Sequence, residues 1–234
     1  MTRTVGLIGG MSWQTTAVYY EGINNHVRSV LGGIHSANLL IRSVDYADIG
    51  RFVTSGDFEG MVEMLSTAGQ QLKDGGAQSL VLCANVAHKA ANSLEERTGL
   101  PVLHIVDFTG QAILDRGFRK VGLMATRAVM EEEFYKSLLQ ERYGLEVVVP
   151  NKEFRDKVDG YIFNELSKQP IAENVKASFE DACTGLVREH GVDCLALACT
   201  ELRLVLDASK MSVPAFETTT LHVKGIAEWA LQHK

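Results

Sequence analysis

Two pairs of matched segments, both separated by 116 positions, constrain the fold of this chain more than any other feature of its sequence. Residues 79–85 (SLVLCAN) and 195–201 (LALACTE) each lead from an apolar run into a cysteine, a small residue and a polar side chain. Residues 5–10 (VGLIGG) and 121–126 (VGLMAT) match at the same separation. Two matches at one separation predict a chain built from two copies of one half, with a thiol at the same place in each copy.

The thiols of these matched segments, Cys83 and Cys199, are the candidate catalytic residues. If the two halves face each other, the thiols face each other as well, which is the geometry that a two-base proton transfer needs. Each cysteine ends an expected strand just before an expected helix, and a helix N-terminus lowers the pKa of a nearby thiol. A single cysteine at a strand end is more often a buried core residue, so the duplication is the reason to prefer a catalytic role.

Short apolar runs alternate along the chain with longer amphipathic runs, such as residues 57–75, in which apolar side chains follow helical spacing. This alternation indicates an α/β protein in which helices cover both faces of parallel sheets. We expect two similar three-layer domains with four-stranded parallel sheets, related by a pseudo-two-fold axis, with the active site in the cleft between them. The first domain would comprise residues 1–103 and 217–234, and the second residues 104–216.

The individual strands and helices are predicted from the same runs. The expected strands are residues 4–8, 37–43, 79–83, 102–105, 120–124, 145–149, 194–198 and 213–216. The expected helices are residues 15–30, 57–75, 88–98, 109–116, 130–143, 157–168, 171–190 and 221–233. Open parallel sheets bind ligands at the carboxyl ends of their strands, and both candidate cysteines fall at such ends.

Composition and charge exclude several classes of partner. The 234 residues carry a formal net charge of −6 without a basic stripe, so nucleic acid is not expected to bind. No apolar run approaches the roughly 20 residues that cross a bilayer, and a signal-peptide pattern is absent, so we expect a cytoplasmic protein without a membrane partner. Since CxxC and HExxH motifs are absent, no metal site is expected. Cys183 and Cys194 lie in apolar stretches and are expected in the core.

Several residues beside the expected strand ends could bind the carboxylate of a small molecule. The turn at residues 9–12 (GGMS) offers backbone amides, and Asn85 and Thr200 offer short polar side chains. Each has a structural alternative, which is a tight turn without a ligand for the first and helix capping for the other two. Glu201 could orient a neighbouring group or an amine, or it could complement a helix dipole.

The same residues carry a resemblance to a known family over essentially the whole chain. They are Gly9-Gly10-Met11-Ser12, Cys83 with Asn85, the segment at Thr126, and Cys199-Thr200-Glu201, together with the crossover-like segment 100–105 (LPVLHI). With these motifs the chain resembles the cofactor-independent aspartate/glutamate racemases of the Asp/Glu/hydantoin racemase superfamily. The resemblance implies an enzyme that interconverts the L and D enantiomers of an amino acid without pyridoxal phosphate.

In such an enzyme, one cysteine thiolate removes the Cα proton of the substrate and the other thiol delivers a proton to the opposite face. Hydrogen-bond donors around the substrate carboxylate would stabilise the developing carbanion charge. The resemblance implies substrate-binding residues at Met11, Ser12, Asn85, Val86, Thr126, Thr200 and Glu201. It also implies a homodimer whose ligand is a small molecule, either an amino acid or a carboxylic acid.

The chain departs from the family pattern where the substrate would bind. Threonine is common in the family at or near three positions that are apolar here, Ala84, Val86 and Val129. Each lost hydroxyl removes a hydrogen bond worth about 0.5–1.5 kcal/mol. Members that select acidic substrates carry an arginine that the loop at residues 43–49 lacks, although Arg155 or Lys157 could bind a distal carboxylate. We therefore expect a broader or less acidic substrate.

Two alternative functions stay open. One is a superfamily member with an altered reaction, such as an isomerase, a decarboxylase or a racemase of another carboxylic acid, which the lost hydroxyls motivate. The retention of both thiols favours proton transfer on two faces instead. The other alternative is a non-catalytic homologue that kept the ligand-binding cleft.

Overall fold

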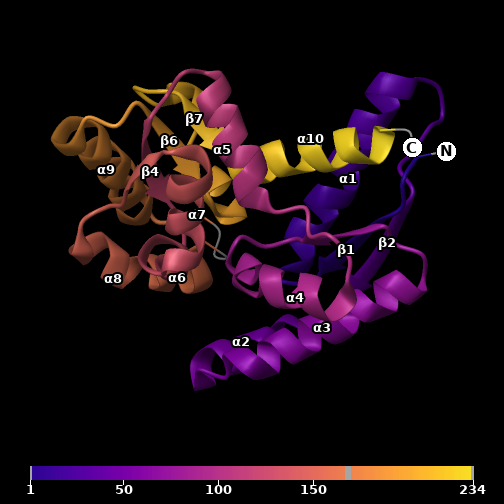
Figure 1. Cartoon of the computed structure of the whole chain (residues 1–234). Coiled ribbons are helices and arrows are strands. Elements are labelled where there is room, and N and C mark those ends of the chain that lie inside the picture. Colours follow the sequence, from indigo (N-terminus) through magenta and orange to yellow (C-terminus); the bar gives the residue numbers. More distant parts are fainter. Residues whose placement is uncertain (1, 167–169, 233–234) are drawn as a thin grey trace. The chain divides into compact units, whose positions relative to one another are not determined.

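The computed structural model describes residues 2–166 and 170–232, and the chain divides into two compact units (Figure 1). The first unit combines Met1–His104 with His222–Lys234, and the second is Ile105–Leu221. The chain therefore leaves the first unit after His104 and returns to it at His222. The predicted helix ends at residues 168 and 233 lie outside the described residues.

A three-stranded parallel sheet forms the centre of the first unit. Its order is β2-β1-β3, with β1 (Val5–Gly9) between β2 (Leu39–Ser43) and β3 (Ser79–Leu82). The helical elements of this unit are α1 (Trp13–Leu31), α2 (Tyr46–Ser55), α3 (Phe58–Asp74), the 3₁₀ helix η1 (Val86–Ala90), α4 (Ala91–Thr98) and most of α10 (Thr218–Leu231). Helix α2 is absent from the sequence-based prediction, which treats residues 43–49 as a loop.

Each face of this sheet has its own apolar core, because successive side chains of a strand point to opposite faces. Val5 and Leu7 of β1 pack with α1 and α10, through residues such as Ile23 and Ile226. Ile8 belongs to the core on the other face, which α3 and α4 complete. Strand β1 is therefore buried on both faces, and its continuous apolar run is the pattern typical of a central parallel strand.

The fourth strand predicted for the first sheet, residues 102–105, is wrong. Val102 makes one isolated parallel bridge with Leu80, and the chain becomes helical three residues later. The preceding residue, Pro101, has no amide hydrogen with which to extend the ladder. Pairing is limited to the bond from the Leu80 amide to Pro101 and the bond from the Leu103 amide to Leu80.

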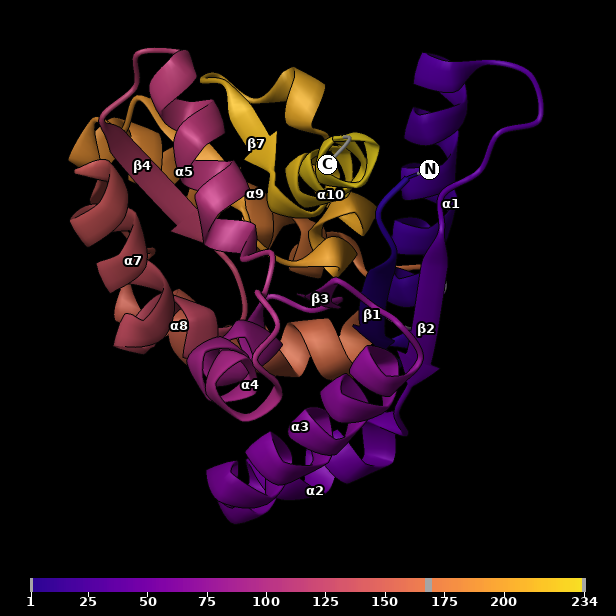
Figure 2. The ribbon, with the colours of Figure 1, turned by 45° about the vertical axis from the view of Figure 1, so that its right-hand side comes forward.

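The second unit has a four-stranded parallel sheet (Figure 2). Its order is β5-β4-β6-β7, formed by β4 (Lys120–Met124), β5 (Glu146–Val148), β6 (Cys194–Leu197) and β7 (Ala215–Glu217). Its helical elements are α5 (Ile105–Asp115), α6 (Arg127–Glu131), α7 (Glu133–Tyr143), α8 (Lys152–Gly160), η2 (Tyr161–Glu165), α9 (Glu173–His190), η3 (Thr200–Leu204) and η4 (Ala208–Lys210). Helix α5 lies beside α7, and α9 lies against β4.

The two sheets share one strand order. In each, the first strand lies between the second and the third, as β2-β1-β3 and as β5-β4-β6. The parallel contact beyond the third strand is the Val102 bridge in the first unit and β7 in the second. The predicted α/β fold with parallel sheets is confirmed, and the repeated order agrees with a duplicated half.

Candidate active site

The two candidate cysteines do not occupy the same place in their sheets. The amide of Cys83 donates to the carbonyl of Ile8 at 3.0 Å, whereas the matching bond to Met124 in the second sheet comes from Ala198 at 2.7 Å. Cys199 is therefore one residue further along its chain than Cys83 in sheet register. The predicted equivalence of the two thiols is wrong by one residue. Because a shift of one residue reverses the direction of a strand side chain, the two thiols have different surroundings.

Cys83 follows the last residue of β3 and is fully buried. Its side chain belongs, with Val81, to the apolar core that the sheet shares with α1 and α10. Burial raises the pKa of its thiol well above the ordinary value. The expected lowering by a helix N-terminus is not found, because the next element is the short 3₁₀ helix η1, which begins only at Val86.

The turn after Cys83 carries two of the predicted substrate-binding residues. Asn85 is buried, and its side chain makes no capping hydrogen bond to η1, while Val86 is half-buried. His88 makes two hydrogen bonds to this turn. Its Nδ1 donates to the Ala84 carbonyl at 2.9 Å, and its amide donates to the Asn85 carbonyl at 3.1 Å. Helix capping therefore does not explain the Asn85 side chain, and its role as a ligand-binding group stays a prediction.

The glycine pair at the end of β1 allows two backbone segments to approach closely. Gly10 has a φ of +94°, and a Cβ built on it would lie 2.0 Å from the carbonyl oxygen of Val44. The Gly10 amide donates to Thr16 Oγ1 at 2.8 Å, and the Thr16 hydroxyl donates to the Ser12 carbonyl at 3.0 Å. Steric contact alone therefore requires glycine at this position.

Ser12 is the N-cap of helix α1. Its Oγ accepts from the Thr15 amide at 3.4 Å and lies 3.2 Å from Thr15 Oγ1. The capping bond satisfies one of the free amides at the start of the helix. Met11, the residue before it, is buried. Both residues follow β1 at its carboxyl end, as predicted, and Ser12 has a structural role there.

In the second unit, Cys199, Thr200 and Glu201 form a hydrogen-bonded group that follows β6. The Cys199 thiol donates to Glu201 Oε2 at 3.0 Å, and the Thr200 hydroxyl donates to the same oxygen at 2.8 Å. All three residues are half-buried. Burial raises the pKa of the Cys199 thiol well above its ordinary value, and the charge of Glu201 and the bond to it raise this pKa further. The thiol is therefore protonated at neutral pH, with a carboxylate in place to accept its proton.

Asp159 of helix α8 belongs to the same surroundings. Its charge also raises the pKa of Cys199, and its Oδ1 accepts from the Arg127 amide at 2.8 Å. Thr126, the residue before, has a buried hydroxyl without a hydrogen-bond partner in the described part of the chain. No local sequence pattern marks Asp159, because only the tertiary structure brings α8 to Cys199.

Arg155 precedes Asp159 by four positions on helix α8, so both residues lie on one face of the helix. Its Nε donates to Glu131 at 3.0 Å, and its guanidinium also donates to the Pro150 carbonyl. Glu131 accepts from Arg127 as well, at 2.8 Å, and the bonds from Arg127 and Arg155 lower the pKa of its carboxyl group. Arg155 is thus on the helix face that approaches Cys199, but its charge is already paired.

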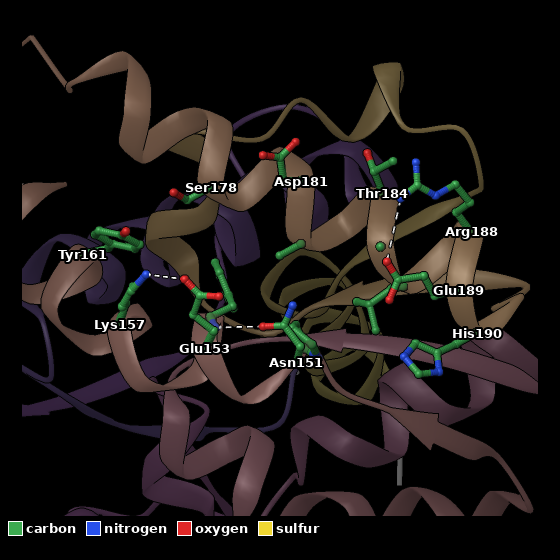
Figure 3. A pocket seen from close by; sticks show the side chains of 15 residues that line it. Asn151, Glu153, Lys157, Tyr161, Ser178, Asp181, Thr184, Arg188, Glu189 and His190 are labelled. Carbon is green, nitrogen blue, oxygen red and sulfur yellow. Dashed lines mark hydrogen bonds and ion pairs between the residues drawn. The ribbon is translucent and has the colours of Figure 1, made fainter.

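Lys157 lines a groove of the second unit that lies between α8 and α9, the α8–α9 groove (Figure 3). Its Nζ pairs with Glu153 at 2.7 Å on an exposed part of α8. The groove has a volume of about 400 Å³, and residues of α9 such as Asp181 and Arg188 form its other side. Cys199 does not line this groove. The structure therefore does not bring Lys157 to the Cys199 group.

The remaining cysteines and the buried histidines give no sign of a metal centre. Cys183 and Cys194 are buried, as predicted, and burial raises the pKa of each thiol to about 12. Across residues 2–166 and 170–232, no group of three or more His, Cys, Asp or Glu side chains is suited to hold a metal ion.

A membrane span needs a helix of sufficient length and sufficient hydropathy. None of the described helices is both long enough and apolar enough to cross a bilayer.

This chain is similar to several known proteins over nearly its full length. A family model described as Asp/Glu/Hydantoin racemase matches residues 8–226. A solved structure from Yersinia pestis, provisionally described as an Asp/Glu racemase, is 40% identical with a TM-score of 0.92, covering 98% of this chain and 100% of its own. An aspartate racemase homologue from Pyrococcus horikoshii OT3 is 29% identical with a TM-score of 0.84, covering 99% and 100%. The broad specificity amino-acid racemase RacX of Bacillus subtilis (strain 168) is 20% identical, covering 98% and 99%.

Proposed function

The chain belongs to the Asp/Glu/hydantoin racemase family, and we propose that it is an amino-acid racemase that works without pyridoxal phosphate. It interconverts L and D enantiomers by proton transfer at Cα, with Cys83 and Cys199 as the two acid/base residues. The observation that carries this proposal is the hydrogen bond from the Cys199 thiol to Glu201. This bond pairs a candidate base with an acceptor for its proton, which is how a weak nucleophile or base is activated.

In the proposed mechanism, the Cys199 thiol first gives its proton to Glu201. The resulting thiolate removes the Cα proton of the substrate, the electron pair of the broken C–H bond delocalises into the substrate carboxylate, and the proton stays on the Cys199 sulfur. Because burial and the Glu201 charge raise the pKa of this thiol, its thiolate is a stronger base than an exposed one.

Cys83 supplies the new proton to the opposite face of the carbanion. Its S–H bond breaks as the new Cα–H bond forms, which leaves a thiolate at Cys83. Loss of the proton on Glu201 to water and uptake of one proton by the Cys83 thiolate restore the starting state. Burial keeps this thiol protonated at neutral pH, as its role as an acid requires. In the reverse direction the two residues exchange roles, so the proposal requires both thiols to reach one Cα from opposite faces.

We assign the substrate carboxylate to hydrogen-bond donors that follow the strand ends. Thr126 supports this assignment, since a buried hydroxyl without a partner among the described residues is a group that a ligand oxygen would satisfy. The other proposed donors are Ser12 and Asn85, and also Thr200, whose hydroxyl would have to turn from Glu201 to the substrate. Met11 and Val86 would form apolar walls. Such donors stabilise the negative charge that develops on the carboxylate as the proton leaves.

We propose a broad substrate range instead of strict selection of aspartate or glutamate. A distal carboxylate would have to compete with Glu131 for Arg155, and Lys157 pairs with Glu153 in a separate groove. Residues 43–49, at the end of β2 and the start of α2, include Asp45 and Asp48 and no arginine. The similarity to a relative named for broad specificity agrees with this proposal.

A homodimer and a cytoplasmic location complete the proposal. The four cysteines are free thiols in the structure, and the reducing cytoplasm keeps thiols in that state. Size-exclusion chromatography with light scattering tests the dimer, for which the expected mass is twice the 25.7 kDa of one chain.

Proton NMR of the purified protein with a panel of L- and D-amino acids in D₂O tests the function directly. The expected result is loss of the Cα–H signal together with formation of the opposite enantiomer, without an added cofactor. Binding without exchange would favour the ligand-binding homologue. Turnover of a carboxylic acid that is not an amino acid would favour the altered reaction.

A further inference from the structure

Three buried histidines meet in the first unit. The exposed fractions of His88, His104 and His222 are 3%, 6% and 0%. The ring centroids of His88 and His104 lie 4.6 Å apart, and those of His88 and His222 lie 5.5 Å apart. The three rings come from η1, from the segment before α5 and from α10. Segments that are distant in the sequence are therefore joined through His88.

The hydrogen bonds of this cluster fix the tautomers of two rings, because a carbonyl oxygen can only accept. His222 donates from Nε2 to the Leu103 carbonyl at 2.8 Å, and its Nδ1 accepts from the Tyr19 hydroxyl at 2.8 Å. His88 donates from Nδ1 to the Ala84 carbonyl at 2.9 Å. Burial, and then the neighbouring histidine, lower the pKa of both His88 and His222, so both rings are neutral at pH 7.

His88 also holds the turn that links the candidate acid to a candidate carboxylate-binding residue. Its ring bonds to the carbonyl of Ala84, and its amide bonds to the carbonyl of Asn85. These two carbonyls directly follow Cys83 in the chain. The position of the imidazole therefore determines the backbone path between the Cys83 thiol and the Asn85 side chain.

The other two histidines stand where the chain passes between the units. His104 is the last residue of the first segment of the first unit, and His222 is the first residue of its returning segment. The ring of His222 donates a hydrogen bond to the Leu103 carbonyl, in the segment by which the chain leaves the first unit. The Leu103 amide in turn donates to the Leu80 carbonyl of β3. The cluster thus connects both crossover segments to the turn that follows Cys83.

We propose that His88 is a positioning residue for the Cys83 half of the active site. Its imidazole holds the Cys83–Asn85 turn through the Ala84 carbonyl and anchors that turn on His104 and His222. The proposal rests on the proposed function only for its catalytic readout, because the ordering of the turn is measurable without a substrate.

Two substitutions of His88 distinguish the loss of the hydrogen bond to the Ala84 carbonyl from the loss of the volume of the ring. His88→Leu removes the donor, whereas His88→Asn places an amide N–H near the position of Nδ1. The matched control is Leu94→Ala, which opens the buried core at α4 and leaves the His88 side chain and its donor to the Ala84 carbonyl in place. Hydrogen–deuterium exchange of the amides at residues 83–88 is measured beside kcat, KM and the melting temperature.

His88→Leu is expected to raise exchange selectively at residues 83–88 and to lower kcat by roughly tenfold to a hundredfold, the cost of a misplaced catalytic group. His88→Asn is expected to restore most of both properties, and Leu94→Ala to lower the melting temperature without a selective change at the turn. Unchanged protection and kcat in His88→Leu would overturn the proposal, and so would equal effects of His88→Leu and Leu94→Ala. If no amino acid is turned over by the wild type, the proposed function fails while the exchange data still decide the positioning role. If His88→Leu does not fold, His88→Gln replaces it, because Gln places its amide near the position of Nε2 and not of Nδ1. Equal exchange at residues 83–88 and equal kcat in the Asn and Gln variants would then overturn the proposal.

Discussion

The Cys199 thiol donates a hydrogen bond to the Glu201 carboxylate, with 3.0 Å between Sγ and Oε2. Cys83 has a different environment, since it lies in the apolar core that β3 shares with α1 and α10. The one-residue difference in sheet register separates these two environments. Two thiols that match in the sequence are therefore chemically unequal, and the proposed mechanism assigns the base that starts the cycle to the one beside a carboxylate.

Replacement of Glu201 by Gln distinguishes the effect of the carboxylate charge on the pKa of Cys199 from the role of the carboxylate as acceptor of the thiol proton. Because the charge of Glu201 raises the pKa of Cys199, Glu201→Gln is expected to lower that pKa and to speed alkylation of Cys199 at neutral pH. If Glu201 also accepts the thiol proton, racemisation falls by roughly 10²–10⁴-fold despite the larger thiolate fraction. Alkylation mapped by mass spectrometry as a function of pH, beside kcat, gives both quantities.

Asp159→Asn is the matched control for Glu201→Gln. It removes another charge that raises the pKa of Cys199 while keeping an oxygen that can accept from the Arg127 amide. We expect faster alkylation with activity retained. Higher activity in both variants would mean that Glu201 acts only through its charge.

Removal of either candidate thiol should abolish racemisation. Cys83→Ser and Cys199→Ser are each expected to lower the rate by about 10²–10⁴-fold, since a serine hydroxyl is a much weaker acid and forms no base at neutral pH. Exchange of the Cα proton of one enantiomer alone should persist at a low rate. Cys183→Ala, in the core of the second unit, is the control and should keep the wild-type rate. Racemisation by both serine variants at the wild-type rate would rule out the two-thiol mechanism.

The pairing of Arg155 is expected to limit the use of acidic amino acids. Glu131→Gln weakens the ion pair at 3.0 Å and releases the guanidinium. The ratio of kcat/KM for aspartate over that for alanine should rise by about tenfold, the size of one charged hydrogen bond. Glu153→Gln releases Lys157 in the other groove and should leave this ratio unchanged. A larger change in the Glu153 variant would place the distal group of the substrate in the α8–α9 groove instead.

The buried histidines should make the folded state sensitive to acid. Because the folded-state pKa values of His88 and His222 lie well below 6.5, the unfolded chain binds protons that the folded chain does not. The free energy of unfolding should therefore be highest above about pH 6.5 and fall as the pH drops below it, by at most about 1.4 kcal/mol per pH unit for each histidine. Urea unfolding at several pH values measures the slope. His222→Gln, which keeps a donor for the Leu103 carbonyl, should reduce the slope, whereas substitution of the exposed His35 by Gln should not.

The glycine turn after β1 should tolerate no side chain. Gly10→Ala places a Cβ against the Val44 carbonyl in addition to the left-handed backbone, so we expect a loss of stability above the roughly 1–2 kcal/mol of the backbone effect alone. Gly33→Ala is the matched control, because Gly33 also has a positive φ, of +56°, but has open space around it. Urea unfolding of both variants measures the difference, and equal losses would contradict the steric explanation.

Much of the fold could be predicted from short stretches of the chain. Strand β4 matches its predicted bounds, and α1 and α3 lie within two residues of theirs. The apolar run of β1 and the helical spacing of α3 are local patterns, and local patterns state how a segment buries its side chains. The strand predicted at residues 102–105 failed because pairing beyond a single bridge depends on a neighbour that the local pattern does not describe.

By itself, the sequence determined the α/β class, the two pairs of matched segments that predict a duplicated half, and the two thiols with the polar residues that follow them. All of these depend on contiguous residues and their periodicity. Only the tertiary structure decided the one-residue register difference between Cys83 and Cys199, the approach of Asp159 to Cys199, the pairing of Arg155 with Glu131, and the meeting of His88 with His104 and His222. These features set the pKa values and the charge of the site, and they arise where burial brings together groups that are far apart in the chain.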